Sequence, residues 1–321
     1  MSDAEPGRTC PLSYRTRPED LAGAVDLSAD TLYLVGGLYG NEQALEAIEA
    51  LADAERRQGL PEPVLVFNGD FNWFNAEPRI LAELNDRVLR HWALQGNVEA
   101  ELADPDPSAG CGCAYPEWVD DATVERSNRI IEALKTALGD NDTLRRALGE
   151  QPKQLAARVG AHRIGLIHGD PESLAGWDLA VERMPPPGEA DGRIMDWFER
   201  ADVSVFACTH TCLPFLQAFE GDTGAGFVIN NGSAGMPNFR GSRDGLISRI
   251  SVHPSPHDSV YGTHRQGLHL DALGVTAVTQ DWLKWFEQRW PAGSPAHQSY
   301  FERLTSGPDY QLGQARRFVR K

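Results

Sequence analysis

Polar residues able to bind a metal ion follow short apolar runs at four places in this chain, and this pattern constrains the fold most. Asp70 follows the run at 64–67, and Asn97, His168 and His210 follow comparable runs. Layered α/β folds place their functional loops directly after such strands. An aspartate, an asparagine and two histidines suit one divalent cation such as Mn, Fe, Ni or Zn. The sequence therefore predicts an α/β fold with a metal site at its strand ends.

Helices and strands are expected to alternate through most of the chain. Apolar runs predict strands at 31–35, 64–67, 92–94, 163–167 and 203–207. Helical periodicity predicts helices at about 42–57, 78–91, 122–138, 141–148, 192–201 and 280–289. Segments 215–219, 226–229 and 246–252 have the pattern of an antiparallel β run. This order indicates a layered α/β domain.

Three regions fall outside this alternation. The core domain is expected at residues 31–252. Residues 1–30 are expected to form an N-terminal extension. Residues 253–321 are expected to form a C-terminal extension, docked on the core by tryptophans such as Trp282. Residues 101–122 form an insertion loop of a length usually linked to function or disorder. We interpret it as a solvated insertion, with a lid over the site as the alternative, because it follows the Asn97 motif directly.

Charge and composition restrict the partners. A formal net charge of −16 repels nucleic-acid phosphates, so we expect no extended DNA or RNA surface. No apolar run approaches the roughly 18 residues of a membrane span, and the acidic N-terminus lacks the apolar stretch of a signal peptide. Five cysteines do not form a disulfide framework. We expect a cytoplasmic protein, and the sequence does not indicate its oligomeric state.

Taken in order, the motifs of this chain resemble those of the calcineurin-like metallophosphoesterases, especially the small bacterial phosphodiesterase branch. Those enzymes carry Asp-x-His, Gly-Asp, Gly-Asn-(His/Cys)-(Glu/Asp), a lone His and Gly-His-x-His. The matching motifs here include Gly69-Asp70, Gly96-Asn97-Val98-Glu99, His168-Gly169 and Thr209-His210-Thr211-Cys212. The resemblance covers about residues 31–252. It implies a four-layer α/β-β/α sandwich, in which two mixed sheets pack face to face with helices outside.

The resemblance also implies which residues hold a metal. Asp70, Asn97, His168 and His210 match the complete ligand set of one of the family's two metal sites. Glu99 is expected to orient groups around that site. Val98 stands where many relatives have a general-acid histidine, so no general acid is evident.

The other metal site has lost all of its private ligands. The first motif of that branch commonly reads Ser-Asp-Ile-His-Gly-Asn, and here it is Gly36-Gly37-Leu38-Tyr39-Gly40-Asn41. Gly37 replaces an aspartate ligand, Tyr39 a histidine, and Cys212 the final histidine. A tyrosine binds metal well only when its phenol, with a reference pKa of about 10, is deprotonated. We therefore predict one ion per chain, with Tyr39, Asn41, Glu99 and Cys212 as neighbouring residues.

The implied function is a metal-dependent phosphoesterase that hydrolyses a small phosphodiester, with a metal-bound water as nucleophile and no catalytic side chain identified. Two cations normally clamp the attacking and leaving oxygens, so one ion predicts reduced or redirected hydrolysis. The alternative is a catalytically impaired relative that binds a metal or nucleotide, or acts as a scaffold. A third class is a different hydrolase or a redox metal protein that uses Cys212.

Two other patterns are weaker. Gly36-Gly37-x-x-Gly40 does not match a dinucleotide-binding loop and is expected to form a tight turn. The spacing of Cys111 and Cys113 is not that of zinc-binding pairs, so we expect buried, inert thiols. The tail histidines are expected to face solvent, and these are His253, His257, His264 and His269.

Overall fold

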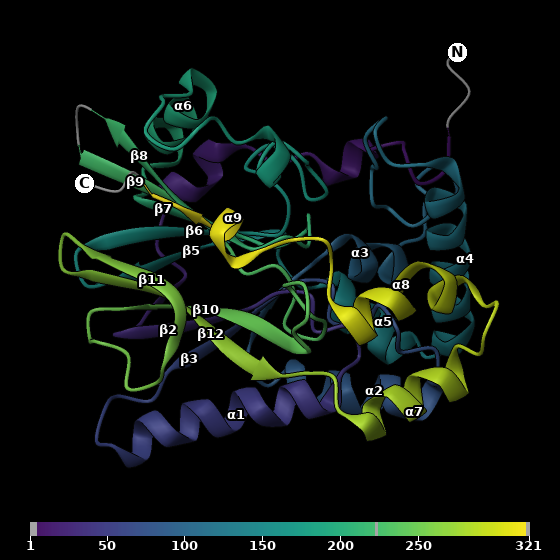
Figure 1. The fold of residues 1–321 in the computed structure, drawn as a ribbon. Coiled ribbons are helices and arrows are strands. Elements are labelled where there is room, and N and C mark those ends of the chain that lie inside the picture. Colours follow the sequence, from purple (N-terminus) through teal and green to yellow (C-terminus); the bar gives the residue numbers. More distant parts are fainter. Residues whose placement is uncertain (1–4, 222–223, 319–321) are drawn as a thin grey trace.

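Two mixed β-sheets packed face to face, with helices on both outer faces, make up the protein (Figure 1). We describe it from a computed structural model, which covers residues 5–221 and 224–318. From one side to the other, the layers are α1, the six-stranded sheet, the seven-stranded sheet and α6. This is the four-layer α/β-β/α sandwich that the motif order implied.

The six-stranded sheet has the order β11-β12-β10-β2-β3-β4. Its strands are β2 (Thr31–Val35), β3 (Val64–Asn68), β4 (Trp92–Leu94), β10 (Asp244–Ser251), β11 (Ser259–Arg265) and β12 (Leu268–Thr276). The β2, β3 and β4 strands are parallel, whereas β10 runs antiparallel to both β2 and β12. Parallel strands end at one edge of a sheet, so the loops after β3 and β4 lie side by side.

The seven-stranded sheet has the order β1-β5-β6-β7-β9-β8-β13. Its strands are β1 (Leu27–Ser28), β5 (Gln154–Val159), β6 (His162–Ile167), β7 (Val205–Cys208), β8 (Phe215–Gly221), β9 (Gly224–Asn230) and β13 (Arg316–Arg317). The β6, β7 and β9 strands are parallel, and β5 and β8 are antiparallel to their neighbours β6 and β9. The loops after β6 and β7 therefore also share an edge.

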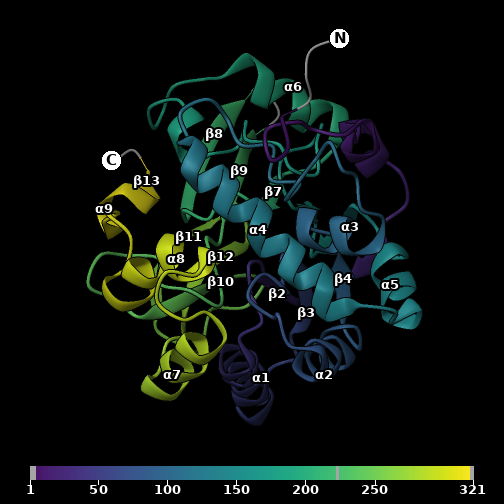
Figure 2. The same cartoon turned by 90° about the vertical axis from the view of Figure 1, so that its right-hand side faces the viewer.

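Helices cover both sheets and one end of the sandwich. They are α1 (Glu42–Arg57), α2 (Pro78–Val88), α3 (Asn97–Ala103), α4 (Asp121–Leu138), α5 (Asp142–Gly149), α6 (Gly192–Ala201), α7 (Gln280–Arg289), α8 (Pro295–Ser306) and α9 (Leu312–Ala315). Viewed from that end, α4 crosses the face between α8 on one side and α3 and α5 on the other (Figure 2). Within the described ranges, no helix is both long and apolar enough to cross a membrane.

Successive side chains of a strand point to opposite faces of its sheet, and they contribute to the apolar cores on those two faces. In β2, Tyr33 and Val35 pack toward the helices of the outer layer, whereas Leu32 and Leu34 pack between the two sheets. A third core lies between the seven-stranded sheet and α6, where Trp197 is fully buried. Each such large apolar side chain contributes about 1.5–3 kcal/mol when it is removed from water.

The C-terminal helices pack on the core through aromatic rings. The Phe74 ring lies 5.3 Å from that of Phe286 and 5.0 Å from that of Tyr300, measured between centroids. Trp290 adds a hydrogen bond of 3.0 Å from its indole Nε1 to the Phe74 carbonyl oxygen. These contacts hold α7 and α8 against the loop that follows Asp70.

Some elements differ from the sequence-based predictions. The predicted antiparallel run is wrong in one respect, because β10 pairs in the six-stranded sheet and not with β8 and β9. A strand's own apolar pattern does not reveal its partner. The segment 259–276, which we placed in a C-terminal extension, forms β11 and β12, so the sheet continues beyond residue 252. The predicted insertion loop starts within α3 and carries no further helix before α4.

Candidate metal centre

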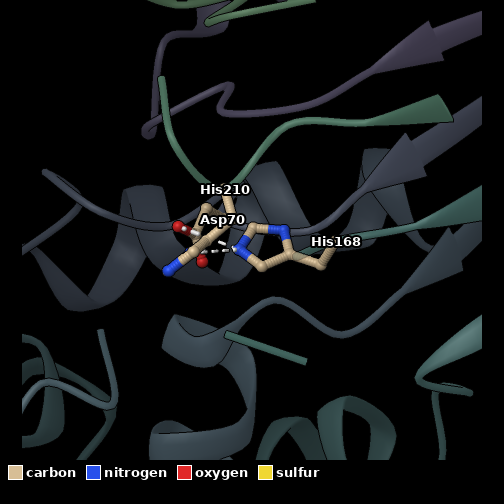
Figure 3. A group of neighbouring side chains, drawn as sticks. All are labelled: Asp70, His168 and His210. Carbon is tan, nitrogen blue, oxygen red and sulfur yellow. Dashed lines mark hydrogen bonds and ion pairs between the residues drawn. The ribbon is translucent and has the colours of Figure 1, made fainter. Parts of the chain in front are cut away.

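Three loops, one from the six-stranded sheet and two from the seven-stranded sheet, bring Asp70, His168 and His210 together beyond the strand ends (Figure 3). One potential ligand atom from each residue lies within 4.8 Å of the others, and all three side chains are buried. Asp70 follows β3, His168 follows β6, and His210 follows β7. These three groups could hold a metal ion.

Glycines allow the loops to approach this closely. Gly69 has a φ of +83°, and a Cβ on it would lie 2.5 Å from the Gly96 backbone nitrogen and from His168 Nδ1. The next residue, Asp70, also has a positive φ of 53°, which non-glycine residues rarely adopt. The Gly-Asp motif therefore provides both the close approach and the turn that aims the carboxylate.

His168 is oriented by a backbone carbonyl. Its Nδ1 lies 2.8 Å from the Asn68 carbonyl oxygen, which only accepts hydrogen bonds, so we assign the proton to Nδ1. Its Nε2 then faces the centre, 3.4 Å from Asp70 Oδ2 and 3.3 Å from Asn97 Oδ1. A histidine held in this way presents one nitrogen lone pair to a cation.

His210 and Asn97 are fixed in the same manner by the insertion loop. His210 Nε2 lies 3.1 Å from the Cys113 carbonyl oxygen, so its Nδ1 faces His168 Nε2 at 3.2 Å. Asn97 donates from Nδ2 to the Cys111 carbonyl oxygen at 3.0 Å, which turns its Oδ1 inward. Asn97 thus lies beside Asp70, His168 and His210, the other three predicted ligands, although its amide does not titrate as their side chains do.

The charges at the centre follow from burial and from the neighbouring residues. Burial, with the adjacent His168, lowers the pKa of His210 to about 3, so this ring is neutral. Burial also acts to lower the pKa of His168, but the Asp70 carboxylate outweighs it and the net shift is upward. Burial acts to raise the pKa of Asp70, yet His168 and His210 bring it below its usual value. Asp70 is therefore the anionic member of the set.

Glu99 holds the ligand loops together. One carboxylate oxygen accepts hydrogen bonds from the backbone N–H groups of Asp70 at 2.7 Å and Gly96 at 3.0 Å. The other accepts from the N–H of Phe71 and from Asn72 Nδ2, each at 3.1 Å. Burial and the nearby Asp70 charge raise the pKa of Glu99 to about 7. All four contacts turn this carboxylate toward the loops.

The other half of the expected dinuclear site is filled by protein. The Tyr39 hydroxyl lies 2.8 Å from Cys212 Sγ, and a Cβ on Gly37 would lie 2.9 Å from Tyr39 Cζ. The tyrosine ring thus occupies the space that a larger side chain at position 37 would need. Burial raises the pKa of Tyr39 well above its ordinary value, and burial also raises the pKa of the Cys212 thiol. Both groups are therefore protonated and are poor ligands.

Asn41, a candidate neighbour of the site, has a different place. Its side-chain oxygen accepts from the Ala44 N–H at 3.0 Å and caps the N-terminus of α1. Its Nδ2 donates to the carbonyl oxygens of Gly235 at 3.1 Å and Ala277 at 2.8 Å. With its polar atoms used in this way, Asn41 connects three segments and does not line the cavity described next.

A cavity of about 160 Å³ opens beside the ligands. It is lined by Tyr39, Asp70, Trp73, Asn97, Cys113, Tyr115, Trp177, His210, Thr211, Cys212, Tyr300 and Arg303. The sequence analysis did not single out Trp73, Tyr115, Trp177, Tyr300 or Arg303. Tyr300 and Arg303 reach the cavity from α8, which lies far from the predicted motifs in the sequence. Trp73, Tyr115 and Trp177 lie in the segments that follow Asp70, Asn97 and His168, but in no motif that marks a site.

The insertion loop is a wall of this cavity. Cys111 and Cys113 are buried, and Trp177 donates from Nε1 to the Cys113 carbonyl oxygen at 2.9 Å. The same carbonyl accepts from His210, so the loop both forms a wall of the cavity and orients a predicted ligand. Our interpretation of residues 101–122 as a solvated insertion is therefore wrong around these cysteines.

Known proteins resemble this chain in structure. The sequence matches no protein-family model and no curated protein. A hypothetical protein from Pyrococcus horikoshii is similar with a TM-score of 0.58 and 14% identity, over 87% of this chain and 99% of that one. A metallophosphoesterase from Sphaerobacter thermophilus has a TM-score of 0.48 and 15% identity, over 87% of this chain and 100% of that one. The paired mixed sheets, their flanking helices and the motifs at their strand ends give this chain the calcineurin-like phosphoesterase fold.

Proposed function

We propose that this protein is a metal-dependent phosphoesterase that hydrolyses a small phosphodiester with one divalent ion, in the cytoplasm. The observation that carries the proposal is the orientation of the four donors. In Asn97, His168 and His210, one polar atom is hydrogen-bonded to a backbone carbonyl while the other faces the centre. Asp70 accepts the Val98 N–H on Oδ1 at 3.1 Å and turns Oδ2 to His168.

The donor set fits a divalent cation. Two oxygens and two imidazole nitrogens are borderline ligands of the kind that Mn, Fe, Ni and Zn accept. Lowering the pKa of His210 to about 3 removes the competing proton from one of them. Such an ion would act as a Lewis acid toward a phosphoryl oxygen and would lower the pKa of water at the site.

The chain's own residues determine which substrates fit. A cavity of about 160 Å³ is below the range of pockets that bury drug-sized ligands, so it accepts a phosphoryl group and a small substituent. Aromatic side chains on its walls exclude water from the reacting group. The net charge of −16 disfavours an extended nucleic acid.

The absence of an acid at position 98 has a consequence for reactivity. Val98 is buried, and its role is to donate its backbone N–H to the Asp70 carboxylate. Its side chain cannot give a proton to a departing alkoxide. The rate should therefore depend strongly on the leaving group, and diesters of acidic phenols should react much faster than alkyl diesters.

The test is hydrolysis of a p-nitrophenyl phosphodiester with added Mn²⁺, Ni²⁺, Mg²⁺ or Zn²⁺. Wild-type protein is compared with an Asp70→Ala/His168→Ala double variant. The control is His264→Ala, whose ring stacks on His269 in the β11–β12 hairpin. We expect metal-dependent turnover in the wild type and the control, and none in the double variant. Equal background rates in all three proteins would contradict the proposal and leave a metal- or nucleotide-binding scaffold.

A further inference from the structure

Arg303 of α8 reaches the half of the site that has lost its metal ligands. Its Nη2 donates to the Cys212 carbonyl oxygen at 2.9 Å, and its Nε donates to the Pro237 carbonyl oxygen at 3.0 Å. It lines the same cavity as Asp70 and Cys212. The guanidinium is thus anchored beside the residue that stands in place of the final histidine ligand.

This cation has no carboxylate partner. Within residues 5–221 and 224–318, no acidic oxygen lies within 4.0 Å of an Arg303 nitrogen, whereas Arg289 of α7 pairs with Glu77 at 2.9 Å. In the same described part, Nη1 makes no hydrogen bond to protein. An arginine stays charged at any ordinary pH, and a partly buried charge without a partner is costly. Its environment therefore favours an anion in the cavity.

Helix geometry places a second cavity residue beside Arg303. Tyr300 lies three residues earlier in α8, so the two side chains project from the same face of the helix. Both line the cavity, and the Tyr300 ring packs on Phe74 at 5.0 Å between centroids. Docking of α8 thus delivers an aromatic wall and a fixed positive charge together.

We propose that Arg303 binds the phosphoryl group of the substrate and supplies positive charge where the family's other cation would lie. This inference rests on the proposed function, for which Arg303 would be the residue that binds the anionic substrate. The two carbonyl contacts use Nε and one N–H of Nη2, so both N–H groups of Nη1 and the second N–H of Nη2 remain to match two phosphoryl oxygens. A fixed donor of this kind stabilises charge that develops on those oxygens during hydrolysis. The ligand class is a phosphate ester or inorganic phosphate.

The experiment measures binding of inorganic phosphate by calorimetry, to the metal-free protein and to the Mn²⁺-loaded protein. The variants are Arg303→Gln, which removes the charge, and Arg303→Lys, which keeps it without the planar fork. The control is Arg126→Gln, because Arg126 contacts the same helix through Ser299 Oγ at 2.7 Å but does not line the cavity. Mn²⁺ affinity and the melting temperature are measured for every variant.

We expect Arg303→Gln to weaken phosphate binding at least tenfold in both forms, with Mn²⁺ affinity changed less than twofold. Arg303→Lys should retain part of the lost affinity, and Arg126→Gln should bind phosphate like the wild type. In turnover, Arg303→Gln should raise KM and lower kcat.

Phosphate binding that is unchanged in Arg303→Gln would overturn the proposal. If Arg303→Gln also loses Mn²⁺ affinity or melts early, Arg303→Lys decides. If Arg303→Lys recovers phosphate affinity, the result supports a role for the positive charge. If Arg303→Lys behaves like Arg303→Gln, the role of Arg303 is structural and the proposal is overturned. Failure of the wild type to bind Mn²⁺ would contradict the proposed function alone, because phosphate binding to the metal-free protein is measured separately.

Discussion

The two halves of the strand-end site differ in what their side chains do with their polar atoms. In the half formed by Asp70, Asn97, His168 and His210, the outward atoms are hydrogen-bonded and the inward atoms converge. In the half formed by Gly37, Tyr39 and Cys212, the polar atoms bond to each other and the ring takes the free space. One half presents donor atoms suited to a metal ion, and the other half presents a protonated tyrosine and thiol to the same cavity.

The half without metal ligands still has a well-defined backbone conformation. Tyr39 and Cys212 both have positive φ angles, of 54° and 59°, so both lie in left-handed turn conformations. The backbone of this half is therefore as sharply turned as that of Asp70, whose φ is 53°. We therefore expect substitutions of Asp70, Asn97, His168 or His210 to affect metal binding. Substitutions of Gly37, Tyr39 or Cys212 are expected to affect stability.

The largest expected effect is in the ligand half. His168→Ala removes the nitrogen that lies near three other donors, and it leaves the Asn68 carbonyl oxygen without its partner. Loss of a residue that only supports a ligand costs about 10–100-fold in metal affinity, so loss of a ligand should cost more than about 100-fold. Titration calorimetry with Mn²⁺ checks this, with His264→Ala as the control. An affinity within tenfold of the wild type would mean that His168 is not a ligand.

The next effect tests how tightly the filled half is packed. Gly37→Asp restores the carboxylate that relatives carry, but its Cβ would lie 2.9 Å from Tyr39 Cζ and its φ is +61°. Overpacking of this kind costs about 2 kcal/mol of unfolding free energy. Gly59→Asp is the matched control, because Gly59 has a φ of +83° and no atom within 4 Å of an added Cβ. Chemical denaturation should show a larger loss at position 37, and equal losses would mean that packing by Tyr39 contributes nothing.

A smaller effect is expected at the residue that joins the ligand loops. Glu99→Gln keeps the shape but turns an NH₂ group toward backbone N–H donors, which repel it. We expect about a tenfold loss of Mn²⁺ affinity, in the range typical of groups that support a metal ligand. Calorimetry on the folded variant measures this, with the exposed Glu302→Gln as the control. Unchanged affinity would place Glu99 outside the support of the site.

The smallest effect should come from the Tyr39 hydroxyl. Tyr39→Phe removes the 2.8 Å contact to Cys212 Sγ and leaves the ring in place. Because both groups are protonated, we expect a loss of about 1 kcal/mol of stability and no change in metal content. Thermal melting and elemental analysis together check this. A fall in bound metal would show that Tyr39 takes part in ligation.

Much of the fold could be predicted where apolar spacing and chain breaks coincide. The helix α1 was predicted with its observed limits, because its buried face repeats regularly and Asn41 caps its start. β5 was missed, because its sequence of small and charged residues lacks a strand-like apolar run. β11 was missed because only one of its residues, Tyr261, is buried, so it lacks an apolar run. β12 was missed although Leu268, Leu270 and Ala272 alternate as expected for a strand, because the surrounding segment was interpreted as a tail. The pairing of β10 with β2 joins residues more than 200 positions apart, which local patterns do not encode.

The candidate site divides in the same way. Four ligands were predicted because each lies in a short motif at a strand end, and the structure brings all four together. That they bind a metal stays a prediction. Trp177 and Arg303 could not be predicted, because they reach the cavity from segments whose docking depends on tertiary packing. Asn41 misled us because the motif position it shares with relatives here serves as a helix cap.

The measurement that tests the central claim most directly is the number of metal ions per chain. Purified protein is saturated with Mn²⁺ or Zn²⁺, dialysed, and examined by elemental analysis beside the His168→Ala variant. We predict one ion per wild-type chain and less than a tenth of an ion in the variant. Two ions per wild-type chain would contradict the account, because they would require ligation by the half that Tyr39 and Cys212 fill.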